Sequence, residues 1–286
     1  MGDSSVCYKW PSKRRRKRLA IVLPASVLRV EQTLLLKTLK SGIIGRAATV
    51  YRVDEIGLFL DPDSSKEDLN LIKTILEYQV TPPHLKRKVF PIRRELRYSS
   101  LLPPLKIPSH IVPSAPKEGA VLDGFVESCS GGICKVYLGS LGYGTMPKSQ
   151  AGGAGKIITV KILGVHGEGL KIVRSSWGRT YTGYKVKAFN TLVQASKHYA
   201  RRGYTVIGTD KNGTCPPESW RILKDSACKN HTAIFFGGPY RGLLEYASPS
   251  QFHYILNTIP HQGTESVRTE EAVIATLQAL SVICGM

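Results

Sequence analysis

The sequence contains no long hydrophobic run. Its 286 residues include no apolar stretch near the roughly 18 residues that a membrane-spanning helix needs. The longest apolar run near the start, residues 19–23, is followed by Pro24 and is too short for the core of a signal peptide. We therefore expect a protein with no membrane partner, located in the cytoplasm, or in the nucleus or nucleolus if the source is eukaryotic.

Cysteine pairs with metal-ligand spacing are also absent. The six cysteines form no C-x-x-C pair, and only Cys129 and Cys134 are near neighbours. Because structural zinc sites draw on such pairs, we expect no bound metal and predict reduced, buried or incidental thiols. The remaining cysteines are Cys7, Cys215, Cys228 and Cys284.

Several motifs of common enzyme classes are missing. Gly142-Tyr143-Gly144 begins a G-x-G-x-x-G fingerprint but reaches Pro147 where the last glycine would be, which disfavours a dinucleotide oxidoreductase. Gly155-Lys156 lacks the following Ser or Thr of a phosphate-binding loop, and a hairpin is the simpler interpretation. No G-x-S-x-G nucleophile elbow occurs, so a serine hydrolase of that type is disfavoured as well.

Acidic residues are scarce relative to basic ones. The chain has 21 Asp and Glu against 40 Lys and Arg, a formal net charge of +19. An excess of this size attracts polyanions, and nucleic acid is the usual partner. Because each neutralised phosphate releases counterions, we expect RNA binding that weakens steeply with salt.

The basic residues are clustered along the chain. Residues 13–18 form a solid block, and a second cluster at 86–97 includes Phe90 and is followed by Tyr98. The first block also fits a solvated tail or a nuclear-localisation signal. We predict that both clusters contact RNA, through Arg14, Arg15, Arg16, Lys86, Arg87, Arg93 and Arg94.

Composition divides the chain into parts. Residues 1–18 read as a basic arm, and residues 19–105 and 179–286 alternate strand and helix patterns typical of an α/β fold with a parallel sheet. A proline-rich linker at 106–118 precedes residues 119–178, where short β-like runs alternate with glycines. That segment predicts a small β-barrel of the OB type, a fold that often binds oligonucleotides.

Periodicity predicts the elements of the α/β part. Helices are expected at 28–39, 68–78, 191–201 and 272–280, the last with Thr269 as N-cap. Strands are expected at 19–23, at 47–53 and 56–60 as one interrupted region, and at 184–189, 204–209, 232–236 and 254–256. Because ligands bind at the carboxyl ends of parallel strands, the glycine loops at 208–213, 236–242 and 258–263 are site candidates.

Several of these segments resemble the motifs of SPOUT RNA methyltransferases. Phe236-Gly237-Gly238-Pro239, the loop 257–264 and the helix start 268–272 are similar to the cofactor loops of that family. Residues 42–48, Gly-Ile-Ile-Gly-Arg-Ala-Ala, resemble its first motif, although Lys40 stands where the motif has asparagine. Residues 78–83 and 96–105 resemble the archaeal and eukaryotic branch that carries an OB-like insertion.

The resemblance implies a fold, a cofactor and a partner. The C-terminal segment would thread a trefoil knot in an α/β parallel sheet, and two chains would form a homodimer with sites near the interface. S-adenosylmethionine would bind in the knot, and members of this branch are associated with N3-methylation of a uridine in large-subunit rRNA. The implied cofactor residues are Gly208, Thr209, Asn212, Phe236, Gly237, Gly238, Pro239, Gly242, Asn257, Thr258, Ile259, Pro260, Gly263, Thr264 and Val267.

Methyl transfer depends mainly on positioning and electrostatics, so an enzyme nucleophile is not required. Arg46 matches the arginine of the first motif and would hold a phosphate or stabilise a deprotonated base. Arg268 would bind RNA or the cofactor carboxylate, and Glu265 or Asp210 would act as a base. The alternative is that these residues have no catalytic role: the arginines would form structural ion pairs, and the acids would be solvated carboxylates. An alternative function is a non-catalytic RNA-binding or ribosome-assembly protein with the same fold.

Overall fold

The computed structural model describes residues 8–166 and 169–284, which form two compact units. One unit comprises residues 15–80, 94–104 and 183–284, and the other comprises residues 8–14, 81–93 and 105–182. Residues 81–93, expected in the α/β part, are thus grouped with the barrel. Residues 8–18, expected as an arm, divide between the two units, and residues 1–7 of that arm lie outside the described residues.

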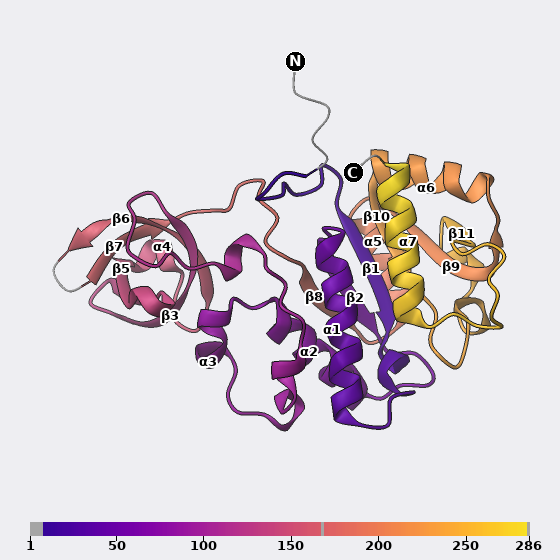
Figure 1. Ribbon diagram of the computed structural model, residues 1–286, viewed down its shortest axis with the longest axis horizontal. Helices are drawn as coiled ribbons and strands as arrows, with labels where there is room; N and C mark the ends of the chain where they lie inside the picture. Colours follow the sequence, from indigo (N-terminus) through magenta and orange to yellow (C-terminus); the bar gives the residue numbers. More distant parts are fainter. Residues whose placement is uncertain (1–7, 167–168, 285–286) are drawn as a thin grey trace, which may run out of the picture. The chain divides into compact units, whose positions relative to one another are not determined.

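The larger unit is built on a six-stranded parallel sheet (Figure 1). The strand order is β11-β9-β10-β1-β2-β8. The strands are β1 (Leu19–Pro24), β2 (Glu55–Phe59), β8 (Lys185–Phe189), β9 (Tyr204–Thr214), β10 (His231–Phe235) and β11 (Tyr254–Leu256). The predicted α/β fold with a parallel sheet is therefore confirmed, and the carboxyl ends of β9, β10 and β11 lie at one edge.

Helices cover both faces of this sheet. One face buries Ala20 and Val22 of β1 against Ala195 and Tyr199 of α5. On the other side α1 and α7 lie next to each other (Figure 1). Across the described residues, no helix is both long enough and apolar enough to cross a membrane. The helices are α1 (Leu34–Val50), α2 (Lys66–Val80), α5 (Leu192–Arg201), α6 (Glu218–Lys229) and α7 (Thr269–Ile283).

The first long helix differs from the expectation. A helix was expected at 28–39 and a strand at 47–53, but α1 runs from Leu34 to Val50. Thr49 and Val50 suggested a strand because β-branched residues favour one. Burial of one helix face and the bond from Thr49 Oγ1 to Gly45 O, 2.9 Å, outweigh that preference.

The smaller unit contains a closed five-stranded barrel in the order β3-β4-β5-β7-β6. All pairs are antiparallel except β5 with β7, and β3 closes the barrel on β6. This order, with α4 between the third and fourth strands, is that of an OB barrel, as expected from the sequence. Its elements are β3 (Val121–Ser130), β4 (Ile133–Tyr137), β5 (Tyr143–Pro147), α4 (Lys148–Ala151), β6 (Ile157–His166) and β7 (Gly169–Arg174), and the short α3 (Lys86–Val89) belongs to the same unit.

The prediction of reduced thiols is wrong for four cysteines. Cys129 and Cys134 face each other across β3 and β4 and form a disulfide, with Cα atoms 4.0 Å apart. A second disulfide joins Cys228 of α6 to Cys284 beyond α7, with Cα atoms 5.5 Å apart. Both Cα separations were set by tertiary packing, which spacing along the chain does not reveal. Cys215 is free and exposed.

Candidate functional site

Three loops meet at the carboxyl ends of β9, β10 and β11. They are the outer part of β9 (209–213), the segment after β10 (236–242) and the segment between β11 and α7 (257–268). Asn257 Nδ2 donates to Lys211 O at 3.0 Å, and Leu244 N donates to Asp210 Oδ2 at 3.3 Å. Thr269 Oγ1 donates to Gly237 O at 3.0 Å, so the start of α7 is fastened to the second loop. The structure therefore brings together the three segments singled out in the sequence.

The first loop is an irregular segment within β9 rather than a loop that follows the strand. Ile255 pairs with Gly208 and Leu256 with Thr214, so residues 209–213 have no partner in the register with β11. Thr209 Oγ1 donates to Phe235 O, and the Asp210 carboxylate receives Asn212 N. Glycine is required at position 213, because a Cβ there would lie 2.6 Å from the carbonyl carbon of Leu256.

The second loop is closely packed against neighbouring residues. A Cβ on Gly237 would lie 2.8 Å from Leu243 N, and one on Gly242 would lie 3.1 Å from the Asp210 carboxylate. The side chain of Phe236 is buried in the core, so only its backbone faces the loops. Gly208 is similarly constrained, by the side chain of Leu243. These glycines serve close packing against neighbouring backbone and side chains, a role that the sequence did not separate from ligand binding.

The third loop is more open. Asn257 Oδ1 accepts from Ile259 N at 2.9 Å, and Thr258 is buried, with its hydroxyl 2.8 Å from that of Thr276 on α7. Gly263 differs from the other loop glycines, because a Cβ added to it would meet no heavy atom of the described residues within 4 Å. Thr264 is exposed, whereas Pro239, Pro260 and Val267 are half-buried. The loop therefore has an anchored start and free space near its middle.

The expected catalytic residues lie in different surroundings. Arg46, on α1, is half-buried and donates from Nη1 to Pro104 O at 2.9 Å. Glu265 is exposed in the third loop, and its carbonyl accepts from Gln262 at 3.1 Å. Arg268 ends that loop and precedes α7 as N-cap, the position expected for Thr269; its backbone N donates to Glu271 Oε2. Arg268 and Glu265 therefore lie in the same loop, whereas Arg46 contacts the backbone at Pro104.

A group of four charges, of which only Arg268 is largely exposed, holds the end of the third loop. Lys40 Nζ, with only 4% of its side chain exposed, lies 3.4 Å from Glu31 Oε1 and 3.1 Å from Glu270 Oε2. The Arg268 guanidinium lies 3.8 Å from Glu31 and 3.9 Å from Glu270. We call these four residues the charge quartet. Lys40, the departure from the first motif, thus joins α1 to the N-terminus of α7.

Two further polar residues were missed from the sequence. Ser26 Oγ and Asp61 Oδ2 are buried and have no hydrogen-bond partner among the residues that the structure describes. A Cβ on Gly238 would lie 2.9 Å from Ser26 Oγ, so that hydroxyl borders the second loop. Buried polar atoms without partners are rare and are typical of sites that a ligand or water satisfies. No motif identifies these positions.

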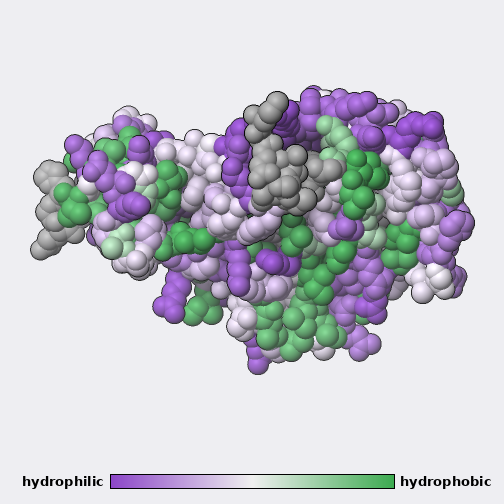
Figure 2. All heavy atoms as spheres, turned by 45° about the horizontal axis from the view of Figure 1, so that its top comes forward, coloured by the Kyte–Doolittle hydropathy of each residue, from purple (hydrophilic) through white to green (hydrophobic). Residues whose placement is uncertain are grey.

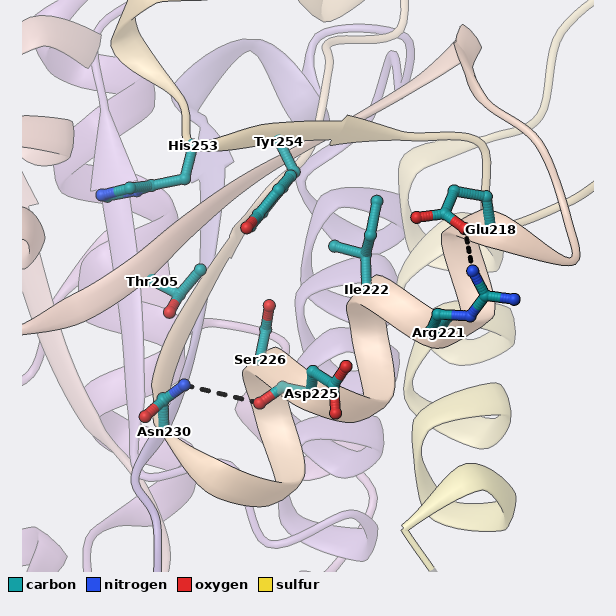
Figure 3. A pocket seen from close by; sticks show the side chains of 9 residues that line it. All are labelled: Thr205, Glu218, Arg221, Ile222, Asp225, Ser226, Asn230, His253 and Tyr254. Carbon is teal, nitrogen blue, oxygen red and sulfur yellow. Dashed lines mark hydrogen bonds and ion pairs between the residues drawn. The ribbon is translucent and has the colours of Figure 1, made fainter.

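Two cavities lie on the β9–β11 side of the sheet. One, of about 400 Å³, is shown in Figure 3, where Arg221 points to Glu218 and the amide of Asn230 to Asp225 O. Its polar groups are thus partly paired with each other. The other, of about 420 Å³, borders the first loop through Asn212. Their linings do not include residues 236–242 or 257–268.

The expected RNA-binding residues differ in exposure. Arg16, Arg87, Arg93 and Arg94 are exposed, and Arg14 is half-buried. Arg15 is only 9% exposed, and burial lowers its pKa to about 10. A guanidinium with so little surface has little room to meet a phosphate, which counts against this expected contact.

Lys86 is expected to destabilise the fold near neutral pH. Burial lowers its pKa to about 8 from an ordinary value of 10.5. Between these values the unfolded chain binds more protons, so stability rises with pH, and the cost of the buried charge is fully present below pH 8. We expect Lys86→Met to raise the Tm at pH 7 by about 2–4 °C, the shift that about 1 kcal/mol produces at this size. The gain should shrink as pH rises from 8 to 10.5, in thermal melts.

The exposed neighbour Arg87 supplies the control for this experiment. Arg87→Met removes a positive charge that is exposed rather than buried. The Tm of this variant should therefore equal the wild-type Tm at each pH. A gain from Lys86→Met that stays constant to pH 10.5 would contradict a titrating buried ammonium.

Comparison with known proteins shows the family to which this chain belongs. A family described as "Putative RNA methyltransferase" matches residues 18–280. An uncharacterised protein of Haloarcula marismortui is 31% identical over 92% of this chain and 98% of its own length. The human 28S rRNA (uridine-N(3))-methyltransferase is 29% identical over 92% of this chain and 77% of its own length; for the Drosophila melanogaster protein of that name the values are 27%, 92% and 61%.

These similarities extend over nearly the whole chain, including both units. They confirm the resemblance read from the loop motifs, and they disfavour both the non-catalytic alternative and the dinucleotide oxidoreductase. The chain belongs to this family and is an RNA methyltransferase.

Proposed function

We propose that this RNA methyltransferase uses S-adenosylmethionine to methylate N3 of a uridine in large-subunit rRNA. The observation that carries the proposal is the meeting of the three loops at the carboxyl ends of β9, β10 and β11. The names of the human and fly relatives support the uridine and its N3 atom. The net charge of +19 supports RNA as the partner.

The residues present fit the cofactor. A purine and an amino-acid group need backbone donors and acceptors at close range, and the third loop offers them with free space at Gly263. Ser26 Oγ and Asp61 Oδ2, unpaired among the described residues, would gain partners from a bound polar group. Ile259 and Val267 would supply apolar contacts, and glycines 237 and 238 hold the second loop in position. We further propose that the C-terminal segment forms the trefoil knot, with the Thr269–Gly237 bond close to its crossing.

S-adenosylmethionine, when bound, supplies an electrophilic methyl group on a sulfonium. The chain's own contribution is to hold the uracil in line with it and to take up the N3 proton. Glu265, exposed in the third loop, would accept that proton. Arg268 would stabilise the negative charge that develops on the uracil, and Arg46 would bind a phosphate.

The test is calorimetric titration of the full chain with S-adenosylmethionine, followed by methyl transfer to large-subunit rRNA. We expect micromolar binding and one N3-methyluridine, identified by nuclease digestion and mass spectrometry. Binding to RNA without binding to the cofactor would overturn the proposal. Methylation at a ribose oxygen would retain the cofactor and overturn the N3 assignment.

We also propose a homodimer formed through α1 and α7. Leu36, Ile43 and Val50 recur at seven-residue spacing on α1 and are exposed, as are Ile274 and Val282 on α7. Figure 2 shows hydrophobic atoms gathered over this part of the molecule. A contiguous exposed apolar surface of this kind is typical of an interface.

Ile43→Asp is expected to convert the dimer to a monomer, because a charge at the centre of a buried apolar stripe is strongly unfavourable. Sedimentation equilibrium should show at least about a tenfold weaker association, or about 1.4 kcal/mol. Val193→Asp, at an exposed apolar position on α5, is the control and should remain dimeric. A monomeric wild type at micromolar concentration would contradict the proposed interface.

A further inference from the structure

The outer surface of the barrel carries an aromatic row across three strands. Phe125 of β3 lies opposite Tyr137 of β4, and Tyr137 lies opposite Tyr143 of β5. Adjacent residues on these strands, such as Val126, Val136 and Gly144, point into the barrel and are buried. The rings of Tyr137 and Tyr143 have centroids 5.5 Å apart. The three aromatic side chains are half-buried, so part of each ring is accessible.

A polar, basic row runs beside the aromatic one. Lys135 of β4 lies opposite Thr145 of β5, and Thr145 lies opposite Lys171 of β7. All three are exposed. Lys135 is two residues from Tyr137, so the rows are separated by about 7 Å along the strand. We call the two rows together the barrel face.

The barrel face is organised before any ligand binds. Lys135 Nζ lies 3.9 Å from the centroid of the Tyr143 ring, and Lys88 Nζ lies 5.1 Å from that of Tyr137. The nearby acid on this face, Glu127, is paired with Lys88 and receives the Tyr143 hydroxyl at 3.3 Å. Its charge is therefore compensated, and Lys135 and Lys171 leave the face positive.

We propose that the barrel face binds single-stranded RNA, with bases stacked on Tyr143 and Tyr137 and phosphates on Lys135 and Lys171. Stacking of bases needs accessible aromatic rings, and binding of the RNA backbone needs cations about one phosphate away from those rings. The two rows supply both, side by side. Duplex RNA does not fit, because its bases are already stacked on each other. This inference adds an RNA-binding surface to the proposed function and rests on that function only for RNA as the ligand.

The test is fluorescence anisotropy of the full chain with a labelled oligouridine of about 12 nucleotides, near the site size of one such barrel. Tyr143→Leu is expected to weaken binding about tenfold, the loss that follows removal of one base stack. Tyr143→Phe keeps the ring and should bind like the wild type. Lys135→Ala with Lys171→Ala should lower the slope of log K against log salt by about 1.4, or 0.7 per phosphate.

Two control variants separate this surface from general charge and from loss of folding. Lys161→Ala removes an exposed lysine of β6 outside the barrel face, and Tyr254→Leu removes an exposed tyrosine of β11. Both should bind the oligonucleotide like the wild type, and every variant should keep the wild-type Tm. The proposal is overturned if Tyr143→Leu binds like Tyr143→Phe, or if blunt duplex RNA competes as well as the single strand.

Titration of the same variants with S-adenosylmethionine separates the two proposals. The barrel-face variants should bind the cofactor like the wild type. A wild type that binds the oligonucleotide but not the cofactor would overturn the proposed function and leave this inference standing. The reverse result would overturn the inference alone.

Discussion

Replacing Lys40 with methionine is expected to lower the free energy of unfolding by about 3–5 kcal/mol, because it leaves buried carboxylates without their central partner. Lys40 is 4% exposed and lies within 3.4 Å of Glu31 and Glu270. Without it, the two acids would share only Arg268 among the described residues, and the Arg268 side chain is 67% exposed. Urea denaturation at pH 7 measures the loss.

The comparison variants test the charge quartet as a unit. Lys37→Met, one turn earlier on α1, removes a lysine that is not buried and should change stability by less than about 0.5 kcal/mol. Lys40→Met combined with Glu270→Gln removes one charge of each sign and should recover part of the loss, because replacing both members of a buried pair costs less than removing one. Equal stability of Lys40→Met and the wild type would contradict the structure at the start of α7.

Gly263→Trp is expected to weaken binding of S-adenosylmethionine at least about a hundredfold, or about 2.7 kcal/mol. A side chain at this position enters open space, so the indole would occupy the room proposed for the cofactor without displacing neighbours. Gly237 is a poorer position for this test, because any side chain there meets the backbone at Leu243. Calorimetric titration gives the change in affinity.

Gly263→Ala is the matched control, since it adds one methyl group in the same open space. We expect it to bind the cofactor like the wild type, and both variants to keep the wild-type Tm. If Gly263→Trp binds as tightly as Gly263→Ala, the third loop does not hold the cofactor at this point, and the proposed site is wrong there.

Elements with strong local patterns were predicted well. The helices expected at 68–78 and 191–201 are α2 (Lys66–Val80) and α5 (Leu192–Arg201). In each, the spacing of apolar residues matches one period over the whole element. The boundary of α1 was wrong, because Thr49 and Val50 favour strands locally while packing of the helix face decides the outcome.

By itself the sequence determined the parallel α/β sheet, the barrel, the three loops and the RNA-methyltransferase family. The sheet, the barrel and the loops follow from periodicity and turn residues, which act over short stretches of chain, and the family follows from the resemblance of several motifs. Tertiary structure alone decided the charge quartet, the two disulfides, and the aromatic and basic rows of the barrel face. It also decided that the buried atoms Ser26 Oγ and Asp61 Oδ2 lack a hydrogen-bond partner among the described residues. Each of these joins residues that are distant in the chain or on different strands. Their contacts depend on strand order and register, which no local pattern encodes.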